Sequence, residues 1–424
     1  MSKLLYDTHD KPPINKLFFL AFQHVFAMFG ATILVPIMIN EACGTEVISI
    51  PTALLCSGIG TLLYILCTKG KSPVYLGSSF AFVTPVIAAF TKDGASGFTT
   101  GIITVGLIYI IFSLLVRFFG KEWIHKLLPP VVVGPMIMII GLSLAPNAVK
   151  QIGIDGSAIE WKGILVAFVS FFVTAYLAIN GKGFLKVIPF LVGIITGYVL
   201  SIALGLVDFT PVGTADIISI PKILIPIKDY TFSFSGMVTL APIALVSIAE
   251  HIGDHMALSS IIGKNLIKDP GLDKTLMGDG CATLFAGLIG GPANTTYGEN
   301  TSVVGMSRVA SVWVTGWAAA ISICMAFMGI IAALFATIPS PVLGGVSLLL
   351  YGFISVNGLK VLVENKVDFN NVKNIVVVSV MLILGLGGAI VTFGTGDVSV
   401  SLTGMSLAAI FGIVLNLILK ENKN

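Results

Sequence analysis

The chain has 424 residues, of which 56% are hydrophobic and only 11% are charged, and its mean hydropathy is +1.00. A soluble domain of this length could not carry that composition without an apolar surface, so a soluble globular protein is excluded and an integral membrane protein is expected. The net charge of +3 gives no reason to expect nucleic acid as a partner.

Apolar stretches of roughly 17 to 25 residues, separated by short polar links, predict transmembrane helices, because a helix satisfies its own backbone hydrogen bonds where water is absent. We predict fourteen spans and therefore an all-α polytopic membrane protein. In chain order the predicted spans are 17–39, 49–68, 73–91, 98–119, 127–148, 161–179, 184–206, 236–258, 274–290, 292–309, 311–338, 341–359, 372–391 and 402–420. The polar segment 1–16 lacks the apolar core and cleavage site of a removable signal peptide.

The distribution of basic residues predicts the orientation of the chain. An even number of spans puts both termini on one side, and if that side is the cytoplasm, nineteen of the 24 Lys and Arg residues fall in inner loops. The outer loops receive only Lys92, Lys150, Lys162, Lys222 and Lys228. Because cytoplasmic loops carry the excess of basic residues, both termini are expected to be cytoplasmic.

The third and tenth predicted spans are interrupted near their middles. The third reads GSSF over residues 77–80, between Pro73 and Pro85, and the tenth begins at Gly291–Pro292 and reads NTTYGEN over residues 294–300. Each is the third of seven spans in its half of the chain. Because each half has an odd number of spans, the second half inserts with the opposite orientation to the first. The pattern predicts a 7+7 inverted repeat in which short extended stretches break spans 3 and 10 and expose backbone amides near the midplane.

Two glutamates, Glu250 and Glu299, lie inside apolar stretches. A carboxylate at bilayer depth costs about 2.5 to 3.5 kcal/mol and usually marks an ion or substrate path. Asp254 is one helical turn after Glu250, so the two carboxyl groups lie close together. Two neighbouring carboxyl groups cannot both ionise easily in a low dielectric, so the pair offers a site for a proton. His24, His251 and His255 are rival proton carriers, and sodium coupling stays open. 

Neither a metal site nor a cofactor is expected, since the five cysteines and the histidines show no metal-binding spacing. An intramembrane acid protease is the alternative from a different class. Residues 278–280 (GDG) resemble the glycine–aspartate signature of such enzymes, but no second aspartate lies in a matching motif. We therefore interpret Asp279 as an internal polar contact and expect no enzyme activity.

Four segments together resemble one known family. They are QHVFAMFGAT at 23–32, LGSSFAF at 76–82, AEHIGDH at 249–255 and NTTYGEN at 294–300, in that order along the chain. The chain resembles the nucleobase-ascorbate transporters over essentially its whole length, and within them the bacterial uracil permeases. The resemblance implies a core domain of residues 1–126 and 236–339, and a gate domain of residues 127–235 and 340–424. It also implies an elevator-like movement of the core against the gate, commonly in a homodimer.

The chemistry of uracil agrees with the residues that the resemblance places at the site. Uracil is planar and alternates two N–H donors with two carbonyl acceptors, so its site needs donors and acceptors in one plane and flat apolar faces. Glu250 and Glu299 supply acceptors. Backbone amides at Phe80 and Gly298 supply donors, and the rings of Phe80 and Tyr297 supply surface. Ser79, beside Phe80, is expected at the same site. The resemblance adds Ala31 to the pocket and places Tyr351 and Ser347 opposite it on the gate.

The expected function is uracil import by proton symport across the cytoplasmic (inner) membrane, with membrane lipid as the surroundings. A xanthine or purine permease of the same family is the alternative, but such relatives tend to carry Gln where this chain has Glu299. An anion transporter of related fold is disfavoured, because two carboxylates at the site would repel its substrate.

Overall fold

The computed structural model describes residues 4–156, 160–186, 188–394 and 400–419. The first half of the chain contains α1 (Ile14–Cys43), α2 (Ile50–Cys67), β1 (Leu76–Ser78), η1 (Phe80–Phe82), α3 (Val83–Phe119), α4 (Glu122–Leu127), α5 (Pro130–Ser143), α6 (Ala145–Ile152), α7 (Trp161–Asn180), η2 (Gly183–Lys186), α8 (Pro189–Ala203) and α9 (Thr210–Gly213). The second half contains α10 (Phe234–Ile262), η3 (Ile267–Gly271), α11 (Leu272–Leu288), β2 (Asn294–Thr296), α12 (Gly298–Ser307), α13 (Val312–Ala326), α14 (Gly329–Ala336), α15 (Ser340–Glu364), α16 (Val372–Leu386), β3 (Ile390–Phe393), β4 (Val400–Thr403) and α17 (Gly404–Ile418).

Within the described residues, seven helices are long and apolar enough to cross a membrane, or eight if the bent pair α13–α14 counts as one span. The protein is therefore a mostly helical polytopic membrane protein. Several predicted spans differ from the helices. The predicted spans 73–91 and 98–119 meet in one element, α3, which is interrupted only by nonhelical backbone at Asp93 and Gly94. The predicted span 311–338 bends by 79° between α13 and α14.

The start of the last predicted span, 402–420, is not helical. Strand β4 occupies its first residues and pairs antiparallel with β3, in the register Ile390↔Thr403. The β-branched residues at 390–392 and 400 favour an extended backbone, and neither strand was expected from hydropathy, which cannot separate a short apolar strand from a helix.

Strands β1 and β2 are fully buried and pair antiparallel, with Gly77 opposite Thr295. Both strands fall on the interruptions of the third and tenth predicted spans. Extended backbone at this depth is tolerated because each strand satisfies the polar groups of the other. Gly77 has to be glycine here, since a Cβ at this position would lie 2.3 Å from the ring of Tyr297.

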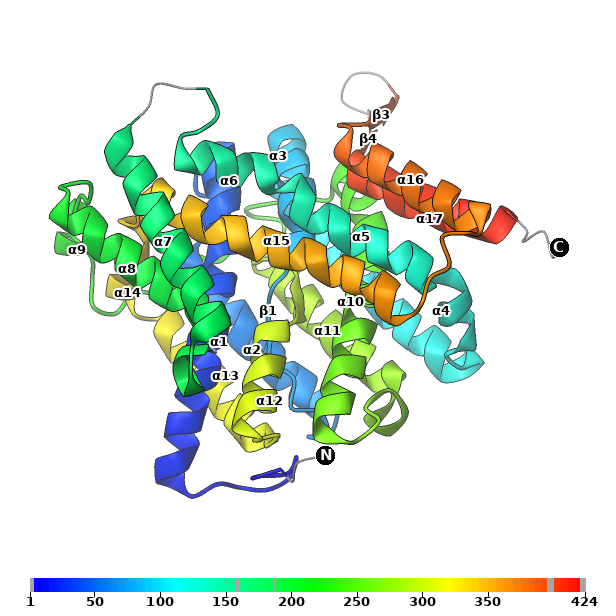
Figure 1. Cartoon of the computed structure of the whole chain (residues 1–424), viewed down its shortest axis with the longest axis horizontal. Coiled ribbons are helices and arrows are strands. Elements are labelled where there is room, and N and C mark those ends of the chain that lie inside the picture. Colours follow the sequence, from blue (N-terminus) through cyan, green and yellow to red (C-terminus); the bar gives the residue numbers. More distant parts are fainter. Residues whose placement is uncertain (1–3, 157–159, 187, 395–399, 420–424) are drawn as a thin grey trace.

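The helices pack into two groups (Figure 1). In the first bundle α1, α2, α3, α10, α11, α12 and α13 pack around the two buried strands. In the second bundle α15 lies between α5 and α7, and α6, α8, α16 and α17 complete the group. Small residues allow close approach inside both bundles: a Cβ at Gly236 of α10 would lie 1.9 Å from the carbonyl oxygen of Gly97 in α3.

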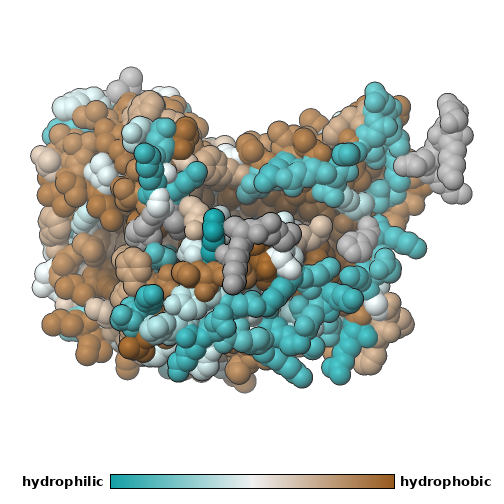
Figure 2. Space-filling view, turned by 60° about the horizontal axis from the view of Figure 1, so that its bottom comes forward, coloured by the Kyte–Doolittle hydropathy of each residue, from teal (hydrophilic) through white to brown (hydrophobic). Residues whose placement is uncertain are grey.

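The surface agrees with a membrane setting. Large apolar side chains are exposed along many helices, including Phe118, Phe172, Val363 and Ile383. Figure 2 shows hydrophilic residues gathered across the middle and lower part of one face, between apolar flanks. Broad apolar flanks around polar faces are what lipid contact requires.

Candidate substrate site

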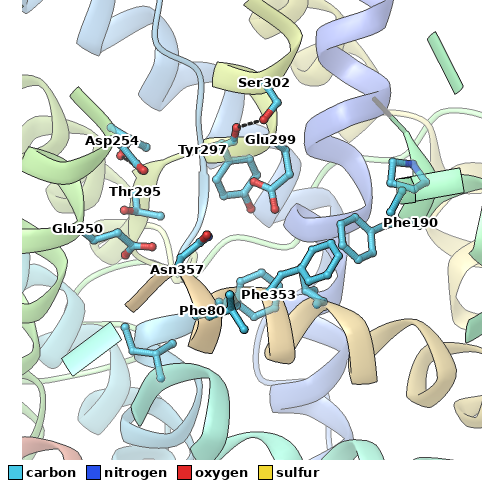
Figure 3. Close-up of a pocket in the computed structure, with 18 of the residues that line it drawn as sticks. Phe80, Phe190, Glu250, Asp254, Thr295, Tyr297, Glu299, Ser302, Phe353 and Asn357 are labelled. Atoms are coloured by element: carbon cyan, nitrogen blue, oxygen red, sulfur yellow. Dashed lines mark hydrogen bonds between the residues drawn. The ribbon is translucent and has the colours of Figure 1, made fainter. Parts of the chain in front are cut away.

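A cavity of about 670 Å³ lies between the two bundles. From the first bundle it is lined by Glu250 and Asp254 of α10, by Thr295 and Thr296 of β2, by Phe80, and by Tyr297, Gly298 and Glu299 at the start of α12. From the second bundle it is lined by Phe190 of α8 and by Leu350, Phe353, Ile354 and Asn357 of α15. Figure 3 shows the acidic side chains and the α15 side chains pointing toward the space between them.

The extended stretch before α12 places Glu299 in the first turn of that helix. Helix starts leave backbone N–H groups without intrahelical partners and carry partial positive charge, so this turn supplies donors to a ligand and favours a carboxylate. No atom lies within 4 Å of the position that a Cβ would occupy at Gly298. A planar ligand can therefore approach the Gly298 backbone closely.

Tyr297 is fixed at the back of the cavity. Its hydroxyl donates to the carbonyl oxygen of Ser78 over 2.9 Å and accepts from the hydroxyl of Thr32 at 3.2 Å. These contacts tie the start of α12 to β1 and α1, so the backbone that precedes Glu299 is held from two sides.

Three carboxyl groups share the cavity, and only one of them is hydrogen-bonded within the part of the chain that the structure describes. Thr296 donates its hydroxyl to Oδ2 of Asp254 over 2.6 Å. Glu250 and Glu299 have no hydrogen bond to another described residue, so their oxygens are available to a ligand in the cavity. Three carboxyl groups in one cavity repel one another when all are ionised.

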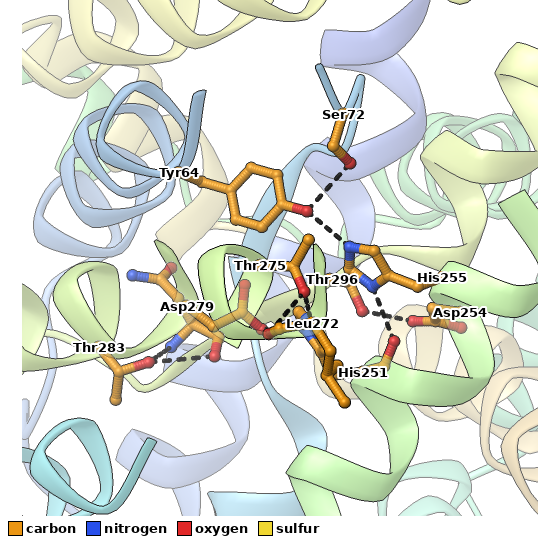
Figure 4. A network of polar contacts seen from close by, with 11 residues as sticks. Tyr64, Ser72, His251, Asp254, His255, Leu272, Thr275, Asp279, Thr283 and Thr296 are labelled. Atoms are coloured by element: carbon orange, nitrogen blue, oxygen red, sulfur yellow. Dashed lines mark hydrogen bonds and ion pairs between the residues drawn. The ribbon is translucent and has the colours of Figure 1, made fainter. Parts of the chain in front are cut away.

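His251 and His255 belong to a separate polar network, which the figure shows from close by (Figure 4). His251 bonds Asp279 through Nδ1 at 2.7 Å and Thr275 through Nε2 at 3.0 Å. His255 lies 2.7 Å from the carbonyl oxygen of His251 and bonds the Tyr64 hydroxyl. Both imidazoles and Asp279 are fully buried and do not line the cavity. One residue is a 100° rotation on a helix, which takes these histidines off the face that holds Glu250 and Asp254.

His24 also lies away from the cavity. It is buried in α1, where its Nδ1 and its carbonyl oxygen both accept from the amide of Asn300 in α12, at 3.1 and 3.0 Å. The side chain joins two helices of the first bundle.

The other expected site residues lie around the cavity rather than in its lining. Ser79 is buried and its amide donates to the carbonyl oxygen of Ala293 at 2.9 Å. Ala31 lines a small adjoining cavity together with Glu299. Tyr351 and Ser347 are buried in α15, and the Tyr351 hydroxyl donates to the sulfur of Met38 in α1 at 2.7 Å.

Several lining residues were not expected from the sequence: Thr295 and Thr296 on β2, Phe190 on α8, and Phe353 and Asn357 on α15. The spacing of residues 350, 353, 354 and 357 is that of one helical face and was a usable signal, since Asn357 is a polar residue within an apolar span. Phe190 and Thr296 gave no such signal, because their place depends on contacts between distant segments.

The comparisons with known proteins agree with this geometry. The sequence profile of the Permease family, the xanthine/uracil permeases, matches residues 15–393. The chain belongs to this family. It is therefore a membrane permease and not an enzyme, as the sequence analysis expected.

Among its relatives, the uracil permease of Bacillus subtilis is 47% identical over 95% of this chain and 92% of its own length. The uracil permease of Escherichia coli is 40% identical over 99% of this chain and 95% of its own length. Among solved structures, the murine anion transporter Slc26a9 in its inward-facing state covers 96% of this chain and 68% of that chain, with a TM-score of 0.70 and 12% identity. The transmembrane domain of the cyanobacterial bicarbonate transporter BicA covers 96% of this chain and 99% of that chain, with a TM-score of 0.59 and 15% identity. These two likenesses concern the fold alone.

Proposed function

We propose that this permease carries uracil across the cytoplasmic membrane in symport with protons. The observation that carries the proposal is that Glu250 and Glu299 open into one cavity with no protein partner among the described residues, next to the first turn of α12. Carboxylates accept from the N–H groups of the ring, and backbone N–H groups of that turn donate to its carbonyl groups. Charge-assisted bonds of this kind are roughly twice as strong as neutral ones. Relatives named uracil permeases, at 40–47% identity over nearly the full length, support the choice of substrate.

The three carboxyl groups in that cavity support proton coupling. Uracil is neutral, so it does not offset their charge, and a site that crosses the membrane with fewer charges meets a lower desolvation cost. Asp254 is the carboxyl group we assign to the coupled proton, because Thr296 already occupies one of its oxygens while both glutamates face the ligand space.

The transport movement we propose uses the two bundles as core and gate. Residues 1–126 and 236–339 would form the core, residues 127–235 and 340–424 the gate, and the complete fold would be fourteen segments in a 7+7 inverted repeat. The pairing of β1 with β2 supports the repeat, since the two strands come from matching places in the halves.

The cavity also reaches Lys186 and Met306, near the basic loops assigned to the cytoplasm, so the conformation is open inward if both termini are cytoplasmic. A homodimer belongs to the proposal through the family resemblance.

Uptake of labelled uracil into proteoliposomes tests the proposal. A proton gradient, acidic outside, should drive accumulation that a protonophore abolishes, and unlabelled xanthine should compete poorly. Uptake that follows a sodium gradient at fixed pH would contradict proton coupling. Uptake blocked better by xanthine than by uracil would contradict uracil as the substrate.

A further inference from the structure

The cavity wall opposite the carboxylates ends in a polar side chain that the proposed function leaves unused. Asn357 is the one amide side chain among the described residues that line the cavity. Apart from Lys186, no other lining side chain of that set carries N–H groups. Its amide makes no hydrogen bond to any other residue in the described part of the chain. Figure 3 shows it directed into the space that Glu250 and Phe80 face.

Two aromatic rings lie beside this amide. Phe353 is one turn before Asn357 on α15, so both side chains share a face of the helix. Phe353 is 42% exposed and lines the cavity, so part of its ring is open to a ligand. The ring of Phe190 from α8 packs edge-on against it, with the centroids 5.9 Å apart and the planes at 76°. This packing holds the Phe353 ring in place.

The cavity has room for more than one small ligand. Its volume of about 670 Å³ is in the range that encloses drug-sized molecules, and a single pyrimidine ring fills only part of such a space. A base bound to Glu250 and Glu299 on one wall therefore leaves the opposite wall accessible. That wall is formed by Phe353 and Asn357 of α15 and is called the α15 wall below.

We infer that Asn357, Phe353 and Phe190 form a second, weaker binding site for a planar heterocycle whose edge presents an N–H next to a C=O. An amide side chain offers one donor and one acceptor in a plane, and so pairs with such an edge in the same bidentate way that Asn pairs with adenine. The Phe353 ring supplies a face for stacking. The site is weaker than the carboxylate site because its hydrogen bonds are uncharged.

The inference rests on the proposed function and deepens it. Lys186 lines the cavity as well, on the side of the basic loops. In the inward-open conformation a base that leaves the carboxylates passes the α15 wall before it reaches the cytoplasm. The second site thus holds the substrate on its way out of the central site.

Equilibrium dialysis of labelled uracil against the purified full-length protein, from micromolar to millimolar concentration, tests this site. The wild type should bind two uracil molecules per chain, the second roughly tenfold or more weakly than the first. Asn357→Leu should abolish weak binding and leave the Kd of the tight site within about twofold of the wild type. The double variant Glu250→Gln and Glu299→Gln should lose the tight class and keep the weak one. Asn365→Ala, at the residue that follows the same helix and outside the cavity lining, is the matched control and should keep both binding sites.

Asn357→Asp guards against a folding artefact, because it keeps the shape and removes the N–H donors; it should weaken the second class and leave the thermal transition unchanged. Binding of a single molecule by the wild type, survival of the weak class in Asn357→Leu, or loss of both classes in that variant would each overturn the second site. A wild type with no tight class at all would overturn the proposed function itself.

Discussion

The hydroxyl of Thr296 donates to Oδ2 of Asp254 over 2.6 Å, which joins the buried strand β2 to the helix that carries Glu250. This bond orients the Asp254 carboxyl group at the edge of the cavity while Glu250, one turn earlier, faces the ligand space. Under the proposed function, Glu250 contacts the substrate and Asp254 carries the proton.

Asp254→Asn should therefore retain uracil binding but lose accumulation against a gradient, whereas Glu250→Gln should weaken both. Thr296→Val keeps the carboxyl group and removes its donor, so we expect an intermediate loss of accumulation with binding nearly unchanged. Binding is measured by calorimetry and accumulation in proteoliposomes over a range of pH. If Asp254→Asn accumulates uracil with an unchanged pH profile, the proton is carried by another group.

Glu299→Gln should lower uracil affinity. The variant replaces a charged acceptor by a neutral amide at the start of α12, and loss of a hydrogen bond to a charged group costs about 1.5–3 kcal/mol, or roughly ten- to a hundredfold in Kd. Calorimetry measures the effect. Glu46→Gln is the control, because Glu46 is an exposed carboxylate paired with Lys222 outside the cavity. Equal Kd values for Glu299→Gln and the wild type would remove Glu299 from the site.

His251→Leu should destabilise the protein. The variant removes the imidazole that bonds the buried carboxyl group of Asp279, and an unsatisfied buried group costs about 1–3 kcal/mol. Thr275 loses its bond to His251 but still donates to the carbonyl oxygen of Leu272. The thermal transition in detergent should fall, whereas the exposed His9→Leu should leave it unchanged. A normal transition for His251→Leu would show that the network contributes little to the free energy of unfolding.

The N-terminal segment should loosen in acid. Asp7 accepts from Lys264, two residues after the end of α10, and this hydrogen bond holds the pKa of Asp7 below its ordinary value of 3.8. A depressed pKa stabilises the docked segment above that ordinary value and the effect disappears as the pH falls through the folded-state pKa. The pair is half exposed, so its contribution is only about 0.2–1 kcal/mol.

Hydrogen exchange measures this docking, because the amides of Ala310 and Val312 donate to the carbonyl oxygens of Tyr6 and Thr8. At neutral pH these amides should exchange faster in Asp7→Asn than in the wild type, and the difference should vanish in strong acid. A difference that persists in acid would assign the docking to other contacts.

The parts of the site that the sequence predicted depend on local chemistry. Glycine, proline and polar residues at 77–80 and 291–300 indicated interrupted helices, and both stretches contain a buried strand. Helical spacing placed Glu250 and Asp254 on one face, and both line the cavity. The pairing of Gly77 with Thr295 is between residues 218 positions apart, and no local pattern specifies such a partner.

The α15 wall was missed for a different reason. Hydropathy treats the span 341–359 as a uniform apolar helix, although Phe353, Ile354 and Asn357 line a cavity. Ser355 and Gly358, beside them on the helix, pack against α5. The bend between α13 and α14 was missed because the chain is apolar on both sides of it. Composition reports the average surroundings of a segment, whereas these features depend on which face meets which neighbour.

Two contacts join α1 to the second bundle, and breaking one of them should shift the conformation of the protein. Glu41 accepts from the amide of Gln151 in α6 at 2.6 Å, and Tyr351 of α15 donates to Met38 one turn earlier in α1. In the proposed cycle these contacts join core to gate on the outer side while the cavity is open inward. Breaking the bond to the Glu41 carboxylate removes about 1.5–3 kcal/mol from this conformation.

Gln151→Leu should therefore lower the ratio of inward-open to outward-open protein by roughly tenfold or more. The measurement uses Ser302→Cys, in the cavity lining, in a background without the five native cysteines. A membrane-impermeant maleimide is added on the side of the membrane that carries the basic loops, and the labelling rate is measured. Labelling should slow in Gln151→Leu. Lys222→Gln is the control, because it breaks an exposed ion pair with Glu46 near the same end of α1, which is worth at most about 1 kcal/mol. Equal labelling rates in Gln151→Leu and Lys222→Gln would mean that the Glu41–Gln151 bond does not hold the outer side closed.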